Sequence, residues 1–311
     1  MLRGRKPVKQ LVVLSGKGGT GKTCISASLM HLCSNSLLNG VFVDADVDAS
    51  NLALVAEAQI LETHQFGGSK LALIDPLSCT SCGKCFEICR FNAIKTPTVQ
   101  NTPYRVIDLL CDGCAACVYG CPDSAITMNQ QQDGEWFHST TPYGHLFHAE
   151  LFPGAENTGK LVTLIKQNAK LYAEDHHIPL MIVDGPPGIG CPVISASAGA
   201  DLALIVAEPS ISGIHDLKRT VKTLEHFRIQ VILCINKADL YCKGKQAIRN
   251  FAKSKNFILA GEIPFDESIP LAMVQGQPIT RFNPRSAASN EIHLIWTEIE
   301  NKLFPDRDQK P

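Results

Sequence analysis

Thirteen cysteines stand out in this chain of 311 residues, and eight of them repeat one spacing. The spacing is C-x2-C-x2-C-x3-C, and it gives a first quartet (Cys79, Cys82, Cys85, Cys89) and a second quartet (Cys111, Cys114, Cys117, Cys121). In such a run three cysteines ligate one iron–sulfur cluster and the fourth ligates the other cluster. The sequence therefore predicts two [4Fe–4S] clusters with crossed ligands. Cluster 1 takes Cys79, Cys82, Cys85 and Cys121, and cluster 2 takes Cys111, Cys114, Cys117 and Cys89.

Zinc is the alternative for these cysteines, but zinc sites usually offer paired C-x2-4-C knuckles rather than quartets. The residues after each fourth cysteine also correspond, as Phe91-Asn92-Ala93-Ile94 and Asp123-Ser124-Ala125-Ile126, which indicates an internal duplication. Gly83, Gly113 and Gly120 suit the tight turns that such a duplication needs. About residues 70 to 130 resemble a bacterial two-cluster ferredoxin, with Arg90 at a position where that family often has proline.

A glycine-rich loop provides a second type of chemistry. Residues 16–23 read G-K-G-G-T-G-K-T after a short apolar run and before a helical stretch expected from Thr23 to Leu38. A strand, loop and helix in this order form a phosphate-binding loop, whose backbone N–H groups surround the phosphates. The loop predicts nucleotide binding by Gly16, Lys17, Gly18, Gly19, Thr20, Gly21, Lys22 and Thr23. Lys22 would reach the phosphates, and the Thr23 hydroxyl would hold Mg²⁺.

The second lysine of this loop, Lys17, resembles that of the deviant Walker A loop in the MinD/ParA/nitrogenase iron protein class. The resemblance implies an ATP-dependent homodimer in which Lys17 crosses to the partner's nucleotide. It covers about residues 8 to 56 and 155 to 285.

Later strand ends support this resemblance and extend the expected site. The segment Val41 to Asp44 resembles the D-x-D strand of the class, which implies that Asp44 positions the attacking water, so that Lys17, Lys22 and Asp44 are the expected catalytic residues. Asp46 and Asp48 are expected near Mg²⁺, with their individual roles left open. The segment from Asp184 to Gly188 resembles Walker B and switch II, which implies that Asp184 also serves the Mg²⁺ site.

The base site is expected from two further segments. Asn236-Lys237-Ala238-Asp239 resembles the N-K-x-D motif, in which the family's Asn contacts adenine, whereas Asp239 leaves the choice of base open. Pro264 lies in a late loop that resembles another part of the base site.

Apolar runs that end in these motifs alternate with helical stretches, which predicts an α/β fold with a doubly wound, mostly parallel P-loop NTPase sheet. The cysteine quartets interrupt it, so an inserted ferredoxin-like α+β domain is expected. The expected boundaries are an ATPase domain at 1–56 and 151–311 and an insert at 57–150. The insert includes the polar, His-rich residues 131 to 150, where packing histidines are favoured over a metal site.

Composition limits the kinds of partner and the cellular location that we expect for this protein. The 29 Lys and Arg residues nearly balance the 30 Asp and Glu residues, so no overall basic excess favours nucleic acid as a partner. We expect no membrane span and a cytoplasmic location, since a chain with this many cysteines and no apparent signal peptide fits metal binding better than disulfides. Cys191, just after the expected switch II, is a candidate for a cluster bridging two subunits.

The function expected from these features is an ATPase that couples ATP hydrolysis to electron transfer through two [4Fe–4S] clusters to a partner protein. Two alternatives stay open. The chain could be a carrier or maturation ATPase for iron–sulfur clusters or metal cofactors, or a ParA-like positioning ATPase. The client protein is not identified by the sequence.

Overall fold

The computed structural model describes residues 7–36, 38–99, 102–155 and 158–305. The chain divides into two compact units, each described by itself below. The large unit comprises residues 1–64, 136–150 and 158–311, and the cysteine-rich unit comprises residues 65–135 and 151–157. No described helix is both long enough and apolar enough to cross a bilayer.

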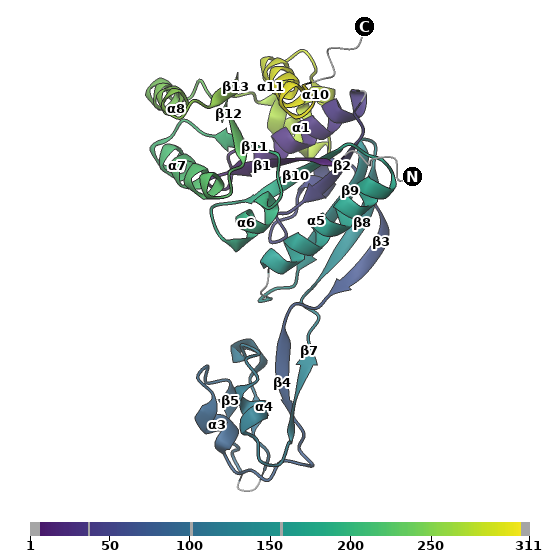
Figure 1. Cartoon of the computed structure of the whole chain (residues 1–311), viewed down its shortest axis with the longest axis vertical. Helices are drawn as coiled ribbons and strands as arrows, with labels where there is room; N and C mark the ends of the chain where they lie inside the picture. Colours follow the sequence, from purple (N-terminus) through teal and green to yellow (C-terminus); the bar gives the residue numbers. More distant parts are fainter. Residues whose placement is uncertain (1–6, 37, 100–101, 156–157, 306–311) are drawn as a thin grey trace. The chain divides into compact units, whose positions relative to one another are not determined.

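Nearly all residues of a nine-stranded sheet belong to the large unit. The order of its strands is β13-β12-β11-β1-β10-β2-β9-β8-β3 (Figure 1). The first seven strands of this order pair in parallel. The strands are β1 (Lys9–Ser15), β2 (Gly40–Asp44), β3 (Gln59–Phe66), β8 (Gly134–Thr141), β9 (Gly144–Leu151), β10 (Leu180–Pro187), β11 (Leu202–Ala207), β12 (Gln230–Asn236) and β13 (Ile258–Ile263).

Helices cover both faces of this sheet, as a doubly wound fold requires. They are α1 (Lys22–Asn35), α2 (Leu52–Val55), α5 (Thr158–Asp175), α6 (Cys191–Ser197), α7 (Ile211–His226), α8 (Cys242–Ser254), α9 (Ser268–Val274), α10 (Ile279–Phe282) and α11 (Ala287–Leu303). One core joins Leu11 and Val13 of β1 to apolar side chains of α1, α10 and α11. The central parallel strands β1, β11 and β12 are almost fully buried because helices cover them on both sides. The α/β sheet expected from the sequence is therefore confirmed.

The cysteine-rich unit contains two short antiparallel ribbons and two short helices. Its elements are β4 (Lys70–Ile74), α3 (Lys84–Ile88), β5 (Ile94–Lys95), β6 (Arg105–Val106), a 3₁₀ turn (Asp108–Leu110), α4 (Ala116–Gly120) and β7 (Ile126–Gln130). Its small core packs Ala72, Ile74, Ile94 and Ile126 against cysteines of both quartets. So few apolar residues give little stabilisation, and natural units this small commonly add disulfides or a structural metal.

The backbone of the cysteine-rich unit repeats at the two quartets. Left-handed backbone occurs at Ser81 and at the corresponding Gly113, and again at Gly83 and the corresponding Ala115. The fourth cysteine of each quartet accepts a backbone hydrogen bond at 3.3 Å, from Ala93 N to Cys89 Sγ and from Ala125 N to Cys121 Sγ. Matched backbone and matched N–H···S bonds indicate that one structural unit is used twice.

Two expectations about this region need correction. Residues 57–64 and 136–150, expected within an insert at 57–150, belong to the large unit, because β9, β8 and β3 continue its sheet beyond β2. Gly120 is not a turn glycine. It lies in α4, where a Cβ atom would come within 2.4 Å of the Ile88 Cδ1 atom, so a larger residue here would displace the end of the Ile88 side chain of α3.

Candidate nucleotide site and cysteine cavities

The phosphate-binding loop joins β1 to α1, and its shape leaves one side open. Gly21 precedes the helix in left-handed backbone (φ 90°), which glycine adopts without strain. A Cβ atom at Gly18 or Gly19 would meet no atom within 4 Å, whereas one at Gly16 would clash with Asp216. The hydroxyl oxygen of Thr20 is buried without a hydrogen-bond partner among the described residues. An open cradle with an unpaired polar atom fits a bound phosphate group.

Lys22 and Thr23 meet Asp184, the acid at the end of β10. Lys22 Nζ lies 3.2 Å from Asp184 Oδ1, and both side chains are buried. The Thr23 hydroxyl donates to Asp184 Oδ2 at 2.9 Å, and the Ser26 hydroxyl donates to Oδ1 at 2.8 Å. Burial lowers the pKa of Lys22, but Asp184, Asp44 and Asp46 raise it more strongly, so its pKa is raised overall and the ammonium group is kept.

The acidic residues at the end of β2 and in the loop that follows it lie in two different environments. Asp44 is buried and accepts hydrogen bonds from Asp46 N, the Ser50 hydroxyl and Leu52 N, so it organises the loop that follows β2. Burial, reinforced by the charge of Asp184, raises the pKa of Asp44 to about 7. Asp46 and Asp48 instead line a cavity of about 730 Å³ together with the loop residues from Gly18 to Thr23.

The expected base site forms a smaller cavity of about 220 Å³ that shares Gly19, Gly21, Cys24 and Met273 with the larger one. Asn236 and Pro264 line the base cavity, as does the neighbouring Lys237. The Asn236 amide donates to the backbone carbonyl of Thr20 at 2.7 Å, so this side chain also supports the phosphate loop. Asp239 is not part of the described lining, and its carboxylate accepts from Phe265 N at 2.7 Å.

Lys17 is not among the residues that line these two cavities, and its side chain contacts its own chain. Its Nζ atom lies 2.9 Å from Glu208 Oε2 and 3.3 Å from the Ser210 hydroxyl. Neither Glu208 nor Ser26 was predicted from the sequence, because each is an ordinary polar residue outside any motif. Only the fold brings Glu208, at the end of β11, next to the loop after β1.

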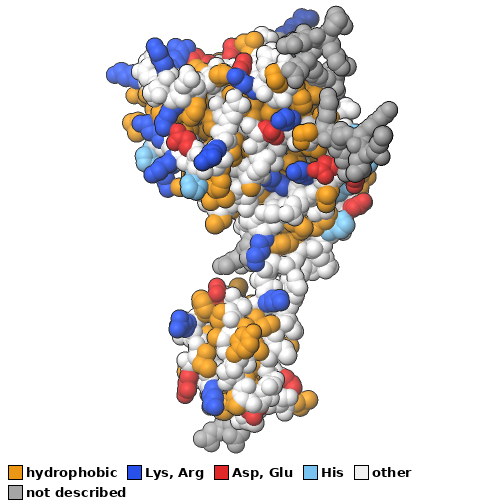
Figure 2. All heavy atoms as spheres, in the orientation of Figure 1, with side chains coloured by type: hydrophobic (Ala, Val, Ile, Leu, Met, Phe, Trp, Pro, Cys, Tyr) orange, Lys and Arg blue, Asp and Glu red, His pale blue; other side chains and the backbone are white. Residues whose placement is uncertain are grey.

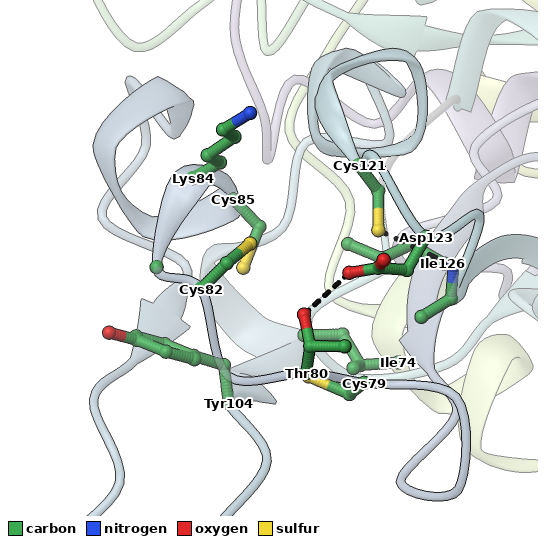
Figure 3. A pocket seen from close by; sticks show the side chains of 12 residues that line it. Ile74, Cys79, Thr80, Cys82, Lys84, Cys85, Tyr104, Cys121, Asp123 and Ile126 are labelled. Carbon is green, nitrogen blue, oxygen red and sulfur yellow. Dashed lines mark hydrogen bonds between the residues drawn. The ribbon is translucent and has the colours of Figure 1, made fainter. Parts of the chain in front are cut away.

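The cysteines of the cysteine-rich unit line two separate cavities. One is lined by Cys79, Cys82, Cys85 and Cys121. Figure 3 shows these side chains around one open space, beside a hydrogen bond of Thr80 to Asp123. The other cavity is lined by Cys89, Cys111, Cys114 and Cys117. Each cavity thus receives three cysteines of one quartet and the fourth cysteine of the other, which is the crossed grouping expected for two clusters.

The cysteine side chains are not arranged around a single point. Across the described parts of the chain, no group of three or more His, Cys, Asp or Glu side chains is placed to hold a metal ion. A zinc ion needs four ligand atoms within about 2.3 Å of one centre, whereas a cubane cluster binds each thiolate at a different iron atom. Burial raises the pKa of Cys85 to about 11, and the nearby Cys79 and Cys117 add to this shift, so the Cys85 thiol stays protonated unless a metal displaces its proton.

Cys191 starts α6 and is exposed. Cys24, Cys33 and Cys234 lie in α1 and β12, and Cys33 and Cys234 are buried. No other described cysteine, histidine or carboxylate joins Cys191 in a metal-binding group within one chain.

The sheet, the phosphate loop and the acids at the strand ends together define a P-loop nucleotide-binding protein of the α/β class. The family model described as the CobQ/CobB/MinD/ParA nucleotide binding domain matches residues 11–279. The chain therefore belongs to this family and is a nucleotide-binding ATPase of the MinD/ParA type.

Individual relatives agree with this assignment. The uncharacterized protein MJ0578 of Methanocaldococcus jannaschii is 34% identical over 293 residues, which cover 94% of this chain and 97% of that protein. The structure of the septum site-determining protein MinD from Pyrococcus horikoshii, complexed with Mg-ADP, matches with a TM-score of 0.57 and 16% identity over 94% of this chain and 96% of that one. An Arabidopsis thaliana protein named as a mitochondrial iron–sulfur protein required for NADH dehydrogenase is 30% identical over 138 residues, 40% of this chain and 44% of that protein.

Proposed function

We propose that the protein is an ATP-hydrolysing iron–sulfur protein in which a nucleotide-gated homodimer couples ATP hydrolysis to electron transfer through two [4Fe–4S] clusters. The observation that carries the iron–sulfur part is the grouping of eight cysteines around two cavities, with crossed membership. The ferredoxin-like role of the cysteine-rich unit and the identity of the partner that exchanges electrons belong to this proposal.

The nucleotide part rests on the groups that surround the larger cavity. Backbone N–H groups of residues 16–21 and the Lys22 ammonium would hold the phosphates of ATP, and Thr23, Asp46, Asp48 and Asp184 would hold Mg²⁺ directly or through water. A bound Mg²⁺ ion would neutralise phosphate charge. Asp44 holds the loop that carries Asp46 and Asp48, and it would orient water for hydrolysis once the site closes.

Lys17 links hydrolysis to assembly in this proposal. Its ion pair with Glu208 is only partly buried, so the lysine can be released at small cost. In the homodimer, Lys17 would leave Glu208 and contact the nucleotide of the partner subunit. Pro187, inside the switch segment, and Pro192, which follows it, line the same cavity and would move with the nucleotide state.

The experiment that tests the proposal is anaerobic purification followed by iron analysis and reductive titration with and without ATP. We expect about eight iron atoms per chain, two clusters that are reduced reversibly, and reduction potentials that shift when ATP is added. Cluster reduction potentials that do not change when ATP is added would contradict the coupling of ATP hydrolysis to electron transfer. A chain that contains no iron would contradict the iron–sulfur part of the proposal.

A second function is favoured by the partial similarity to the Arabidopsis protein and by the exposed position of Cys191. It is a carrier or maturation ATPase, in which Cys191 from two subunits would hold a transferable cluster. Cys191→Ala would then remove a third, labile cluster and leave the other two in place. A ParA-like positioning ATPase remains the third candidate, and it would need no iron for its activity.

A further inference from the structure

A row of titratable side chains connects β3, β8, β9 and α5 on the large unit. Glu62 on β3 lies 3.1 Å from His64 Nε2 and 3.9 Å from His138 Nδ1. His138 Nε2 lies 3.0 Å from His145 Nδ1, and His145 Nε2 lies 2.9 Å from the Tyr172 hydroxyl. The row therefore runs from one strand through the β8–β9 hairpin to a helix, with each group in reach of the next.

Ring stacking fixes these side chains in place. His64 stacks on Trp136 at 4.0 Å between ring centroids, and Tyr172 stacks on His176 at 3.9 Å. His138 stacks on Phe147 at 4.5 Å with an interplanar angle of 7°. Figure 2 shows pale blue His side chains next to an acidic one on the flank of the large unit where β3 and β8 lie.

Each of these four elements lies next to a segment of the cysteine-rich unit in the sequence. The chain enters the cysteine-rich unit from the end of β3 and returns at the start of β8, and it enters again after β9 and returns at α5. The row of side chains thus joins the four elements that border the cysteine-rich unit in sequence. β3 is the last strand in the order of the sheet, it pairs with β8, and its first five residues are exposed.

The contact between His138 and His145 limits how many protons the pair can hold. One ring nitrogen must donate and the other must accept. A first added proton on His138 leaves a donor toward His145 and places the new charge near Glu62. A second proton, on His145, would set two N–H groups and two charges against each other at 3.0 Å.

The surroundings oppose this second proton. Burial lowers the pKa of His145, and the charges of His138 and His176 lower it further. Burial also lowers the pKa of His138, where Glu62 acts in the opposite direction and His176 and His64 act in the same direction. Glu62 and His64 face the pair from β3, Tyr172 faces it from α5, and His176 faces it from the turn that directly follows α5.

We propose that Glu62, His64, His138, His145, Tyr172 and His176 form a proton-sensitive brace. It holds β3 on the β8–β9 hairpin and α5 while the histidine pair carries at most one added proton. The brace opens when the pair takes up a second proton, and β3 is then released from the edge of the sheet. Acidification would in this way loosen the segment of the large unit that leads into the cysteine-rich unit.

Hydrogen exchange of the full chain, prepared anaerobically, tests the brace directly. We expect the protection factor of the peptide covering residues 59–66, corrected for intrinsic exchange, to fall about tenfold or more between about pH 7.5 and pH 5.5. Peptides from β12 should keep their protection over the same range. Equal protection of residues 59–66 at both pH values would overturn the proposal.

A matched pair of variants separates the brace from general acid sensitivity. His145→Gln can still accept and donate hydrogen bonds but cannot take up a proton, so residues 59–66 should stay protected at the lower pH. His293→Gln, at an exposed histidine of α11, should respond as the natural chain does. A wild-type response in His145→Gln would contradict the brace.

If His145→Gln lowers the protection of β12 at the higher pH, the substitution has disturbed the whole large unit. The test is then a histidine titration of the unsubstituted chain, followed by NMR. Ring ¹⁵N chemical shifts of His138 and His145 should then titrate in two separate steps, the second well below the ordinary histidine range. Independent titration of both rings near pH 6.5 would overturn the proposal.

Discussion

The buried pair of Lys22 and Asp184 gives the largest stability effect that the structure predicts. Asp184 is 1% exposed and receives the Lys22 ammonium and the hydroxyl groups of Thr23 and Ser26. Asp184→Asn keeps the size of the side chain but leaves the Lys22 ammonium buried without its main counter-charge. Breaking a buried ion pair in this way costs about 3–5 kcal/mol. Because Asp44 and Asp46 still stabilise the Lys22 ammonium in the variant, we expect the loss in unfolding free energy to lie at the lower end of this range, near 3 kcal/mol.

Urea unfolding of the nucleotide-free chain, followed by tryptophan fluorescence, measures this loss. Both tryptophans, Trp136 and Trp296, lie in the large unit, so the signal reports the unit that contains the pair. Asp201→Asn is the matched control, since its pair with Lys9 is about one-third exposed and should contribute about 1 kcal/mol or less. A loss for Asp184→Asn no larger than that of the control would refute the reasoning.

Four further results are expected. Lys17→Ala should keep ATP binding but lose ATP-dependent dimerisation in sedimentation velocity, and a dimer unchanged by the substitution would reject the role of Lys17. Glu208→Gln should release Lys17 and strengthen ATP-dependent dimerisation up to about fivefold, as about 1 kcal/mol allows; weaker dimerisation would show that Glu208 supports the dimer instead. Cys89→Ser should remove the cluster of the second quartet's first three cysteines and Cys121→Ser the other cluster, to be told apart by electron paramagnetic resonance; loss of the same cluster in both would contradict the crossed ligation. Burial lowers the pKa of His148 to about 4, so the unfolded chain binds its proton more tightly and unfolding free energy should fall as pH drops below about 6.5; a His148→Asn chain with the same pH dependence would assign the effect to other groups.

Much of the fold could be predicted from local patterns. The helix expected from Thr23 to Leu38 corresponds to α1, and the apolar strands expected to end at Asp44, Asp184 and Asn236 are β2, β10 and β12. These predictions succeed because apolar, β-branched runs that end in turn or acidic residues have few alternatives in an α/β protein. The P-loop was equally predictable, since its spacing reflects the backbone conformation that phosphate binding requires.

The boundary of the cysteine-rich unit was harder to predict. Residues 136–150 carry His138, His145 and His148 and read as polar, so they were assigned to the insert. In the structure His138 and His148 are buried by partners distant in sequence or on the next strand, including Tyr172 for His138 and Ser139 for His148. Histidine burial depends on such tertiary partners, which local periodicity does not report.

The orientation of Lys17 shows a similar limit. Its position in the loop is fixed by the motif, but the carboxylate that it contacts belongs to Glu208, which directly follows β11. Strand order decides this contact, because β11 lies directly beside β1 in the sheet. A single sequence gives the strands but not their order, so Glu208 could not be predicted from it.

The central claim is that an ATPase of the MinD/ParA type carries two [4Fe–4S] clusters in its cysteine-rich unit. Metal analysis of the chain purified without oxygen tests this claim most directly. We expect a brown protein with about eight iron atoms and eight acid-labile sulfides per chain, falling to about half in Cys121→Ser. A colourless protein that contains zinc, or no metal at all, would contradict it.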